Sequence, residues 1–204
     1  MRPINPVDEQ RSSIEKYLSL VNRQLSTIMS CILNIETSTS VCSVALSAGG
    51  EVLFEKSSFE GPSHAALLGV YAEEAIAVTK EKGLKLDAVA VSSGPGSYTG
   101  LRIGVSVAKG LCFGYGIPLI SIPTLEVLAV AALEQQNNAS DCLYCAMLDA
   151  RRMEVYAAIY DVNLKTVRET SADIVDAETY ASWLEKGKIC FFGNGAAKCR
   201  EVIT

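Results

Sequence analysis

The sequence contains a single histidine, His64, among 204 residues, and this scarcity limits the sites that the chain can form. A protein zinc site takes three or four ligands, so one imidazole cannot build one. A Ser–His–Asp triad would need this same residue as its base, whereas its place at the start of a predicted helix favours a structural or interface role. We therefore predict no catalytic residue and no metal site.

Long apolar runs and an excess of positive charge are also lacking. No apolar segment reaches the roughly 18 residues that span a bilayer, and residues 1–28 lack the pattern of a signal peptide. The 23 acidic residues exceed the 18 basic ones, giving a net charge of −5. A protein that binds RNA by itself usually has a basic face. We therefore expect a cytoplasmic protein without membrane contact, whose RNA contacts would need a basic partner.

The seven cysteines predict a reducing environment. Their number is odd, no export signal precedes them, and most lie in apolar segments where a thiol packs as a small hydrophobic group. Cys142 and Cys145 form one C-x-x-C pair, but this spacing within a strand sends the two side chains to opposite faces. A metal site at this pair is therefore not expected.

Residues 1–28 differ in character from the rest of the chain. Five apolar residues at helical spacing would allow an amphipathic helix. They are Ile14, Leu18, Val21, Leu25 and Ile28. We favour the alternative that Met29 is the natural start and that this N-terminal extension is not native or is disordered, because an apolar strand begins directly afterwards at Cys31.

After this extension, strands and helices follow in the order β-β-β-α-β-α-β-α. Gly49-Gly50 predicts a hairpin turn between the second and third strands. Three strands joined by tight turns and followed by crossover helices form a mixed sheet, the ribonuclease H-like layout. The predicted strands are Cys31–Ile35, Val41–Leu46, Val52–Phe54, Ala88–Ser92 and Leu119–Ile122, and the predicted helices are His64–Lys82, Tyr98–Tyr115 and Thr124–Leu133.

The remainder of the chain predicts a second, smaller lobe that repeats part of the first. A polar linker, Gln135–Asp141, precedes it. We therefore predict an α/β protein of the actin-like ATPase fold, with two lobes of mixed β-sheets flanked by helices, at residues 29–134 and 135–204. We expect the second lobe to be truncated, because the chain stops where another helix would begin. Its predicted elements are strands Leu143–Leu148 and Glu154–Tyr160, helix Ala177–Lys186 and strand Ile189–Phe192.

The segment Ser93-Gly-Pro-Gly-Ser-Tyr-Thr-Gly-Leu-Arg102 joins a buried strand to a helix. A glycine-rich turn at a helix N-terminus can hold an anion on backbone N–H groups. The segment lacks the lysine and the spacing of a P-loop and does not match the dinucleotide-binding pattern. A tight turn that requires glycine conformations is the favoured alternative.

The predicted helices His64–Lys82 and Tyr98–Tyr115 both have wide apolar arcs. On the second, Gly100, Gly104 and Ala108 form a row of small residues that would let another helix approach closely. So wide an apolar arc must be covered on more than one side. The two helices could cover each other or present a surface to a partner, and periodicity alone supports both equally.

Two turns carry acidic residues that could face a nucleotide. In kinases and ATPases of this fold, the turn after the first strand holds an acid and small hydroxyl residues near the phosphates. Here Glu36, Thr37 and Ser38 are the candidates, although glutamate is one methylene longer than aspartate. In the second lobe Asp149 could act as a catalytic acid, but an ion pair with the adjacent arginines of its own turn is the favoured alternative.

Three motifs carry a family resemblance. They are Ile32-Leu-Asn-Ile-Glu-Thr-Ser-Thr39, Gly94-Pro-Gly-Ser-Tyr-Thr-Gly-Leu-Arg-Ile-Gly104 and Asp149-Ala-Arg-Arg-Met-Glu-Val-Tyr156. In this order they resemble the bacterial TsaB (YeaZ) family over about residues 29–204. The resemblance implies a paralogue of TsaD, the transferase that, with the ATPase TsaE, installs threonylcarbamoyl on the adenosine beside the anticodon of tRNA. The His-x-x-x-His metal pair of TsaD-type enzymes falls at Thr124 and Leu128 here, which implies a non-catalytic subunit.

The resemblance also implies which surfaces this subunit would use. The two apolar helices would pack against their counterparts on TsaD as a four-helix bundle, and would form a homodimer when the chain is alone. tRNA would be reached only through the complex, and ATP or ADP would bind at the complex interface rather than to this subunit alone. The implied interface residues are His64, Leu67, Leu68, Tyr71, Tyr98, Leu101, Arg102, Gly104, Val105 and Ala108.

Two other functions were weighed against this one. A stand-alone ATPase or kinase-like enzyme would use Glu36 and a second phosphate loop, for which Gly193-Asn194-Gly195 is the candidate. A glycoprotease comes last, because it needs a metal pair or a nucleophile–base pair that one histidine cannot supply.

Overall fold

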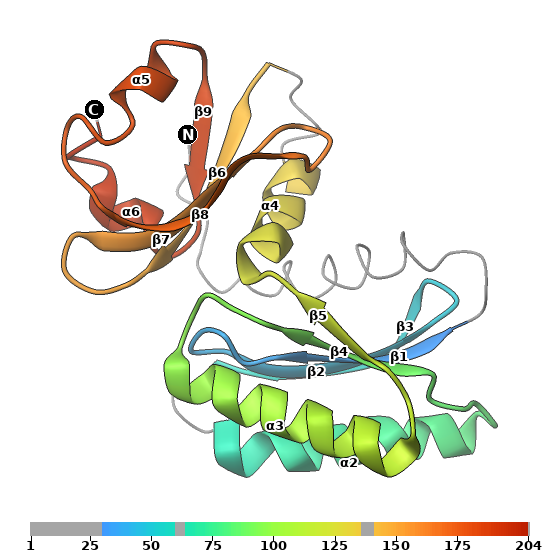
Figure 1. Cartoon of the computed structure of the whole chain (residues 1–204). Helices are drawn as coiled ribbons and strands as arrows, with labels where there is room; N and C mark the ends of the chain where they lie inside the picture. The colour runs from blue at the N-terminus through green and yellow to red at the C-terminus, as the bar shows by residue number, and fades with distance from the viewer. Residues whose placement is uncertain (1–29, 60–63, 136–140, 204) are drawn as a thin grey trace. The chain divides into compact units, whose positions relative to one another are not determined.

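The computed structural model describes residues 30–59, 64–135 and 141–203 (Figure 1). The predicted extension at residues 1–28 therefore lies outside the described residues. The chain divides into two compact units, the first ending at Thr124 and the second beginning at Leu125. Each unit is built around its own β-sheet.

The sheet of the first unit has the strand order β3-β2-β1-β4-β5. β1 pairs antiparallel with β2, and β2 with β3, whereas β1 and β4, and β4 and β5, run parallel. The Gly49-Gly50 turn between β2 and β3 has positive φ at both residues, as its sequence predicts. This mixed sheet is the predicted ribonuclease H-like layout. The strands are β1 (Cys31–Glu36), β2 (Cys42–Ala48), β3 (Glu51–Ser58), β4 (Ala88–Ser92) and β5 (Leu119–Ile122).

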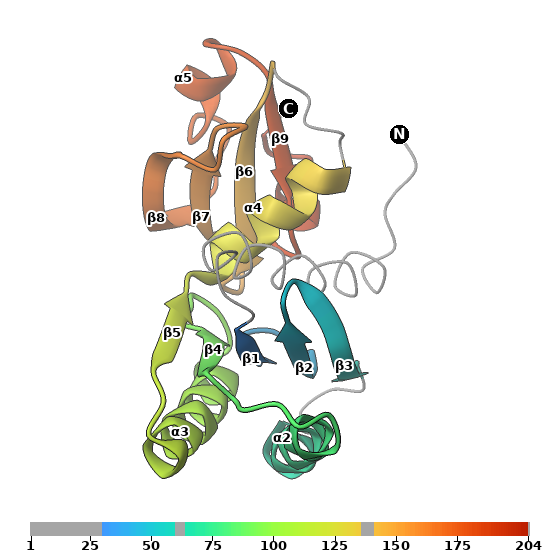
Figure 2. The same cartoon turned by 90° about the vertical axis from the view of Figure 1, so that its right-hand side faces the viewer.

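Two helices, α2 (His64–Glu81) and α3 (Tyr98–Tyr115), cover one face of this sheet and lie side by side (Figure 2). α3 begins where the Ser97 hydroxyl accepts a hydrogen bond from Gly100 N and ends at Gly116, whose φ is 64°. The core beneath the helices consists of apolar side chains that alternate along the strands, such as Leu33 and Ile35 of β1, with Leu68 of α2 packed on them.

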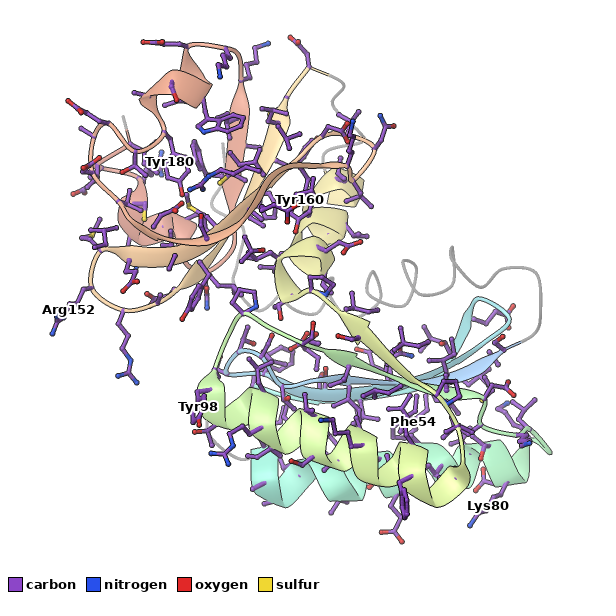
Figure 3. All side chains as sticks on the ribbon, in the orientation of Figure 1. Phe54, Lys80, Tyr98, Arg152, Tyr160 and Tyr180 are labelled. Atoms are coloured by element: carbon purple, nitrogen blue, oxygen red, sulfur yellow. The ribbon has the colours of Figure 1, made fainter. Side chains whose placement is uncertain are left out.

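The second unit repeats the first four strands of the first. Its sheet has the order β8-β7-β6-β9, with antiparallel pairs β6/β7 and β7/β8 and a parallel pair β6/β9. The predicted internal repeat is therefore confirmed at the level of topology. One face of the sheet packs on α4, and the other on α5, α6 and the buried Tyr180 (Figure 3). The elements are α4 (Thr124–Gln135), β6 (Leu143–Asp149), β7 (Glu154–Tyr160), β8 (Thr166–Ile174), α5 (Ala181–Leu184), β9 (Ile189–Phe192) and α6 (Ala196–Cys199).

Three features of this unit differ from the prediction. β8 was not predicted, because most of its side chains are polar and exposed at the sheet edge and show no apolar alternation. The helix predicted at Ala177–Lys186 is the shorter α5, because the Asp176 carboxylate accepts hydrogen bonds from Glu178 N and Thr179 N and holds a turn there. The unit boundary falls before α4 rather than after it, because the apolar side chains of α4 pack on β6 and β7.

Candidate functional site: the outer face of helices α2 and α3

The carboxylate of Glu36, where β1 leads into the β1–β2 turn, is hydrogen-bonded by neighbouring groups of the chain. Glu36 Oε1 accepts a hydrogen bond from Ser38 N at 2.6 Å, and Glu36 Oε2 accepts one from the hydroxyl of Ser92 on β4. Thr37 and Ser38 are almost completely buried, and within the described chain their hydroxyl oxygens have no hydrogen-bond partner. In the described structure the Glu36 carboxylate is hydrogen-bonded within the chain and the two hydroxyls are enclosed, while the proximity of Glu36, Thr37 and Ser38 to a nucleotide stays a prediction.

Glycines of the β4–α3 loop and of α3 allow the β1–β2 turn to lie closer to α3 than residues with a side chain would permit. A Cβ on Gly100 would lie 2.1 Å from Thr37 O, and one on Gly104 would lie 2.2 Å from Thr37 Oγ1. At Gly96 it would lie 2.3 Å from Ser38 O, and the adjacent Ser97 N donates to that same oxygen at 2.6 Å. The prediction that this row of small residues admits a partner helix is therefore wrong, since the row faces the chain's own β1–β2 turn.

Several predicted interface residues are likewise buried inside the first unit. His64 Nε2 lies 3.1 Å from Val41 O, and Leu68 and Tyr71 belong to the core beneath α2. Gly104 and Ala108 are buried on the inner side of α3. The prediction that these five residues lie on the surface is wrong, because they are on the sides of α2 and α3 that face the interior of the unit. Leu67, Leu101 and Val105 are half-buried, and Tyr98 and Arg102 are exposed.

The side of the two helices that points away from the sheet carries a different set of residues, which we call the outer face. It contains exposed aromatic and aliphatic side chains next to exposed glycines. Phe113 is 92% exposed and Val70 is 49% exposed. A Cβ on Gly69, Gly110 or Gly114 would meet nothing within 4 Å. The outer face consists of Ala65, Ala66, Gly69, Val70, Glu73 and Ala77 of α2, and Tyr98, Arg102, Ser106, Lys109, Gly110, Phe113 and Gly114 of α3.

The N-terminal end of α3 contributes an ordered pair to this face. Tyr98, labelled in Figure 3, is 74% exposed, and the guanidinium of Arg102 lies 5.3 Å from the centre of its ring. Arg102 Nη1 also donates to Tyr98 Oη at 3.3 Å. At an exposed site a cation stacked on an aromatic ring contributes about 0.5–1 kcal/mol, so the contact favours this arrangement of the two side chains.

Sequence reasoning missed most of the outer face. Gly69 and Gly110 interrupt helices where alanine would be more favourable, and Phe113 lies one helical turn beyond Lys109 on the polar line of α3. Glycines at four-residue spacing on the solvent side of a helix are the signal that could have identified the outer face from the sequence. The row that sequence reasoning selected is the inner one, because periodicity alone does not say which small-residue stripe faces the sheet.

The β6–β7 turn of the second unit resembles the β1–β2 turn in its backbone contacts. Asp149 Oδ1 accepts from Arg151 N at 2.8 Å, as Glu36 accepts from Ser38 N. The predicted ion pair with the adjacent arginines is wrong, because Lys198 of α6 is the partner of Asp149. A hydrogen bond from Lys198 is the main cause that lowers the pKa of Asp149.

The glycine loop after β9 packs in the same way as the loop after β4. A Cβ on Gly193 would lie 2.3 Å from Met147 O, and Gly195 N donates to that oxygen at 3.1 Å. Asn194 Oδ1 accepts from Asp149 N at 2.9 Å. The candidate second phosphate loop is thus bound to the end of β6.

The described residues contain no group of three or more His, Cys, Asp or Glu side chains placed to hold a metal ion. Thr124 begins α4 and is buried, and Leu128, one turn further along the same helix, packs against the core of the second unit. None of the described helices combines the length and the apolar character needed to cross a membrane.

Comparison with known proteins places this structure in a family. The family model described as "TsaD: tRNA N6-adenosine threonylcarbamoyltransferase" matches residues 60–200. The tRNA threonylcarbamoyladenosine biosynthesis protein TsaB of Escherichia coli K12 is 37% identical over 131 residues, covering 63% of this chain and 54% of the relative. The chain belongs to the TsaB/YeaZ family. The TsaB of Bacillus subtilis 168 is 28% identical over 177 residues, covering 84% of this chain and 74% of the relative.

Solved structures agree with this assignment. YeaZ from Pseudomonas aeruginosa superimposes with a TM-score of 0.63 at 29% identity, covering 72% of this chain and 69% of that one. The fold is the predicted actin-like ATPase fold with two mixed α/β sheets. The match spans about half the length of the first curated relatives, 54% for the Escherichia coli protein and 51% for the Haemophilus influenzae TsaB.

Proposed function

We propose that this TsaB-family chain is a non-catalytic subunit that binds and stabilises a TsaD-type transferase for threonylcarbamoyl modification of the tRNA adenosine beside the anticodon. The observation that carries the proposal is the outer face of α2 and α3, where Phe113 is 92% exposed beside glycines that face open space. The names of the curated relatives support the pathway, since they are tRNA threonylcarbamoyladenosine biosynthesis proteins.

The composition of the outer face suits close helix packing. Burying a phenylalanine or valine side chain yields about 1.5–3 kcal/mol. The exposed glycines Gly69, Gly110 and Gly114 would allow the backbone of a partner helix to approach closely, as small residues do at helix crossings. In the free chain each of the three glycines costs the helix up to about 1 kcal/mol relative to alanine. A partner helix on this face would offset that cost.

Charge on the outer face is divided between the two helices. Arg102 and Lys109 lie on α3, and Glu73 lies on α2. A partner that repeats this arrangement can place its acidic helix opposite the basic one, which favours one pairing over others. A second copy of this chain satisfies the requirement by symmetry, so we propose a homodimer in isolation, and we propose that a paralogous helix pair on TsaD takes the same place in a mixed complex.

The inside of the molecule supports a non-catalytic role. Glu36 is hydrogen-bonded by Ser38 N and the Ser92 hydroxyl, and the single histidine lies against Val41 O. Thr124 and Leu128 carry no imidazole nitrogen that could replace the histidine pair of TsaD-type enzymes. We further propose that TsaE and tRNA engage the complex rather than this subunit alone, and that any ATP or ADP binds at the complex interface.

The test is a pair of matched substitutions. Val70→Glu on the outer face and Val167→Glu on β8 each place a carboxylate on a valine of similar exposure, 49% and 42%. Isothermal titration calorimetry with the TsaD-type paralogue should show at least a hundredfold weaker binding for Val70→Glu and unchanged binding for Val167→Glu. Sedimentation should show the same pattern for self-association. Equal affinity of both variants would refute the interface, and ATP turnover by the isolated chain would favour the kinase-like alternative.

A further inference from the structure

The β6–β7 turn carries two consecutive arginines in a backbone conformation that arginine rarely adopts. Arg151 has a φ of 74° and Arg152 a φ of 48°. Both values lie in the left-handed region, where glycine and asparagine are favoured and other residues are strained. Among the described non-glycine residues, only Leu164 shares a positive φ. Strain of this kind is commonly retained where side chains serve a binding function.

Lys198 holds this turn in place. Its Nζ donates to Arg152 O at 2.7 Å and to Glu154 O at 2.6 Å, and it forms the ion pair with Asp149. Ala150 N donates to Glu154 O at 3.0 Å and closes the hairpin. The turn is therefore held by contacts to its backbone, and the carboxylate of Asp149 at its start is paired with Lys198.

The two guanidinium groups are left available for a ligand. Both arginines are exposed, and in the part of the chain that the structure describes neither forms an ion pair. Figure 3 shows Arg152 extending away from the ribbon of the turn. Two consecutive arginines on a turn whose backbone is held by contacts place two positive charges together in sequence on a chain whose net charge is −5.

We propose that the Arg151–Arg152 turn binds the phosphodiester backbone of RNA. The planar fork of guanidinium N–H groups matches phosphate oxygens in two-point hydrogen bonds, which a single lysine ammonium does not reproduce. No base-reading group is required, so the contact positions the RNA without selecting sequence. The inference rests on the proposed function for naming this RNA as tRNA. An acidic protein surface is the competing occupant.

The test variant is Arg151→Gly/Arg152→Gly, because glycine fits the left-handed turn and removes both side chains. Its matched control is Lys165→Ala/Lys186→Ala, which removes two exposed positive charges from the same unit. The assay measures binding of an unmodified tRNA transcript to the complex with the TsaD-type paralogue over a series of KCl concentrations. We expect roughly tenfold weaker binding and a log–log salt slope reduced by about 2 for the glycine variant, with neither change in the control.

Stability and partner binding separate the competing outcomes. The glycine variant should unfold at the same temperature as the parent or higher. If it does not, Arg151→Asn/Arg152→Asn, which also tolerates the turn, replaces it. Unchanged tRNA affinity and salt slope would overturn the inference, as would normal tRNA binding with weakened binding of the paralogue. If no complex forms, the proposed function fails, and cross-linking of tRNA to the isolated chain at low salt decides the inference. Loss of the cross-link in the glycine variant supports it, and an equal cross-link overturns it.

Discussion

Two glycines of the same helix should respond to the same substitution with opposite signs. Gly110→Ala adds a methyl group that meets nothing within 4 Å, whereas in Gly104→Ala the added Cβ would lie 2.2 Å from Thr37 Oγ1. In an exposed helix position alanine is more favourable than glycine by up to about 1 kcal/mol, so Gly110→Ala should raise the free energy of unfolding. At Gly104 the neighbouring turn must move by about 1 Å, an overpacking that costs about 1–3 kcal/mol and outweighs the helix-propensity gain.

Urea denaturation of the two variants measures this difference directly. Both measurements belong in a Phe113→Glu background, because self-association of the native state would otherwise raise the apparent stability. We expect the two free energies of unfolding to differ by about 1–3 kcal/mol, the overpacking cost at Gly104, because the gain in helix propensity is common to both variants; Gly110→Ala should be the more stable. Association with the paralogue should then be weaker for Gly110→Ala in an otherwise unaltered outer face, since the new methyl group occupies the space for a partner helix. Equal stability of the variants would refute the orientation of α3, and unchanged association of Gly110→Ala would refute the close helix approach.

Two further predictions concern the interiors of the units. Thr37→Ala should restore most of the stability lost in Gly104→Ala, because it removes the Oγ1 atom that the new Cβ would meet. It should not rescue Gly100→Ala, whose Cβ would meet the backbone oxygen of Thr37. Urea-unfolding energies that are additive for Thr37→Ala and Gly104→Ala would contradict this prediction. In the second unit, Asp173 accepts two hydrogen bonds from Arg168, and its pKa is lowered by its hydrogen-bond donors although burial opposes this. The contribution of Asp173 to stability is therefore present above the unfolded-state pKa of about 3.9 and is lost as the pH falls below it. Asp173→Asn should lower the free energy of unfolding by about 3 kcal/mol at pH 7 and should flatten the fall in stability at acidic pH. If stability falls with acid as it does in the parent, the network does not contribute in this way.

The fold was largely predictable from the sequence, because its strands and turns have strong local signals. Strand β4 is a continuous apolar run, and Gly49-Gly50 and Gly116 lie where positive φ is required. β8 has no such signal: it is a polar edge strand whose pairing with β7 is set by the rest of the sheet. A nine-residue strand can therefore be specified almost entirely by its neighbour.

The candidate site was less predictable, because its details depend on contacts between distant segments. The width of the apolar arc on α3 was evident, but which glycines face inward depends on the approach of Thr37 from the β1–β2 turn. Asp149 has two arginines beside it in the sequence, yet it pairs with Lys198, 49 residues away. Neighbouring charges in the sequence therefore did not identify the ion-pair partner of Asp149, which comes from α6.

In both turns that could face a nucleotide in this fold, the acidic side chain accepts a hydrogen bond from a backbone N–H of the same turn. Glu36 accepts from Ser38 N in the first unit, and Asp149 accepts from Arg151 N in the second, two residues further along in each case. Each turn is packed against a glycine loop that follows the parallel strand beside it, and the loop contacts backbone atoms of the turn or of the strand end before it. The two surfaces that we propose for recognition lie on the outside of each unit: the glycine-lined outer face of the first and the exposed arginines of the second. This placement supports the proposed role of a subunit that keeps an actin-like ATPase fold and works by binding.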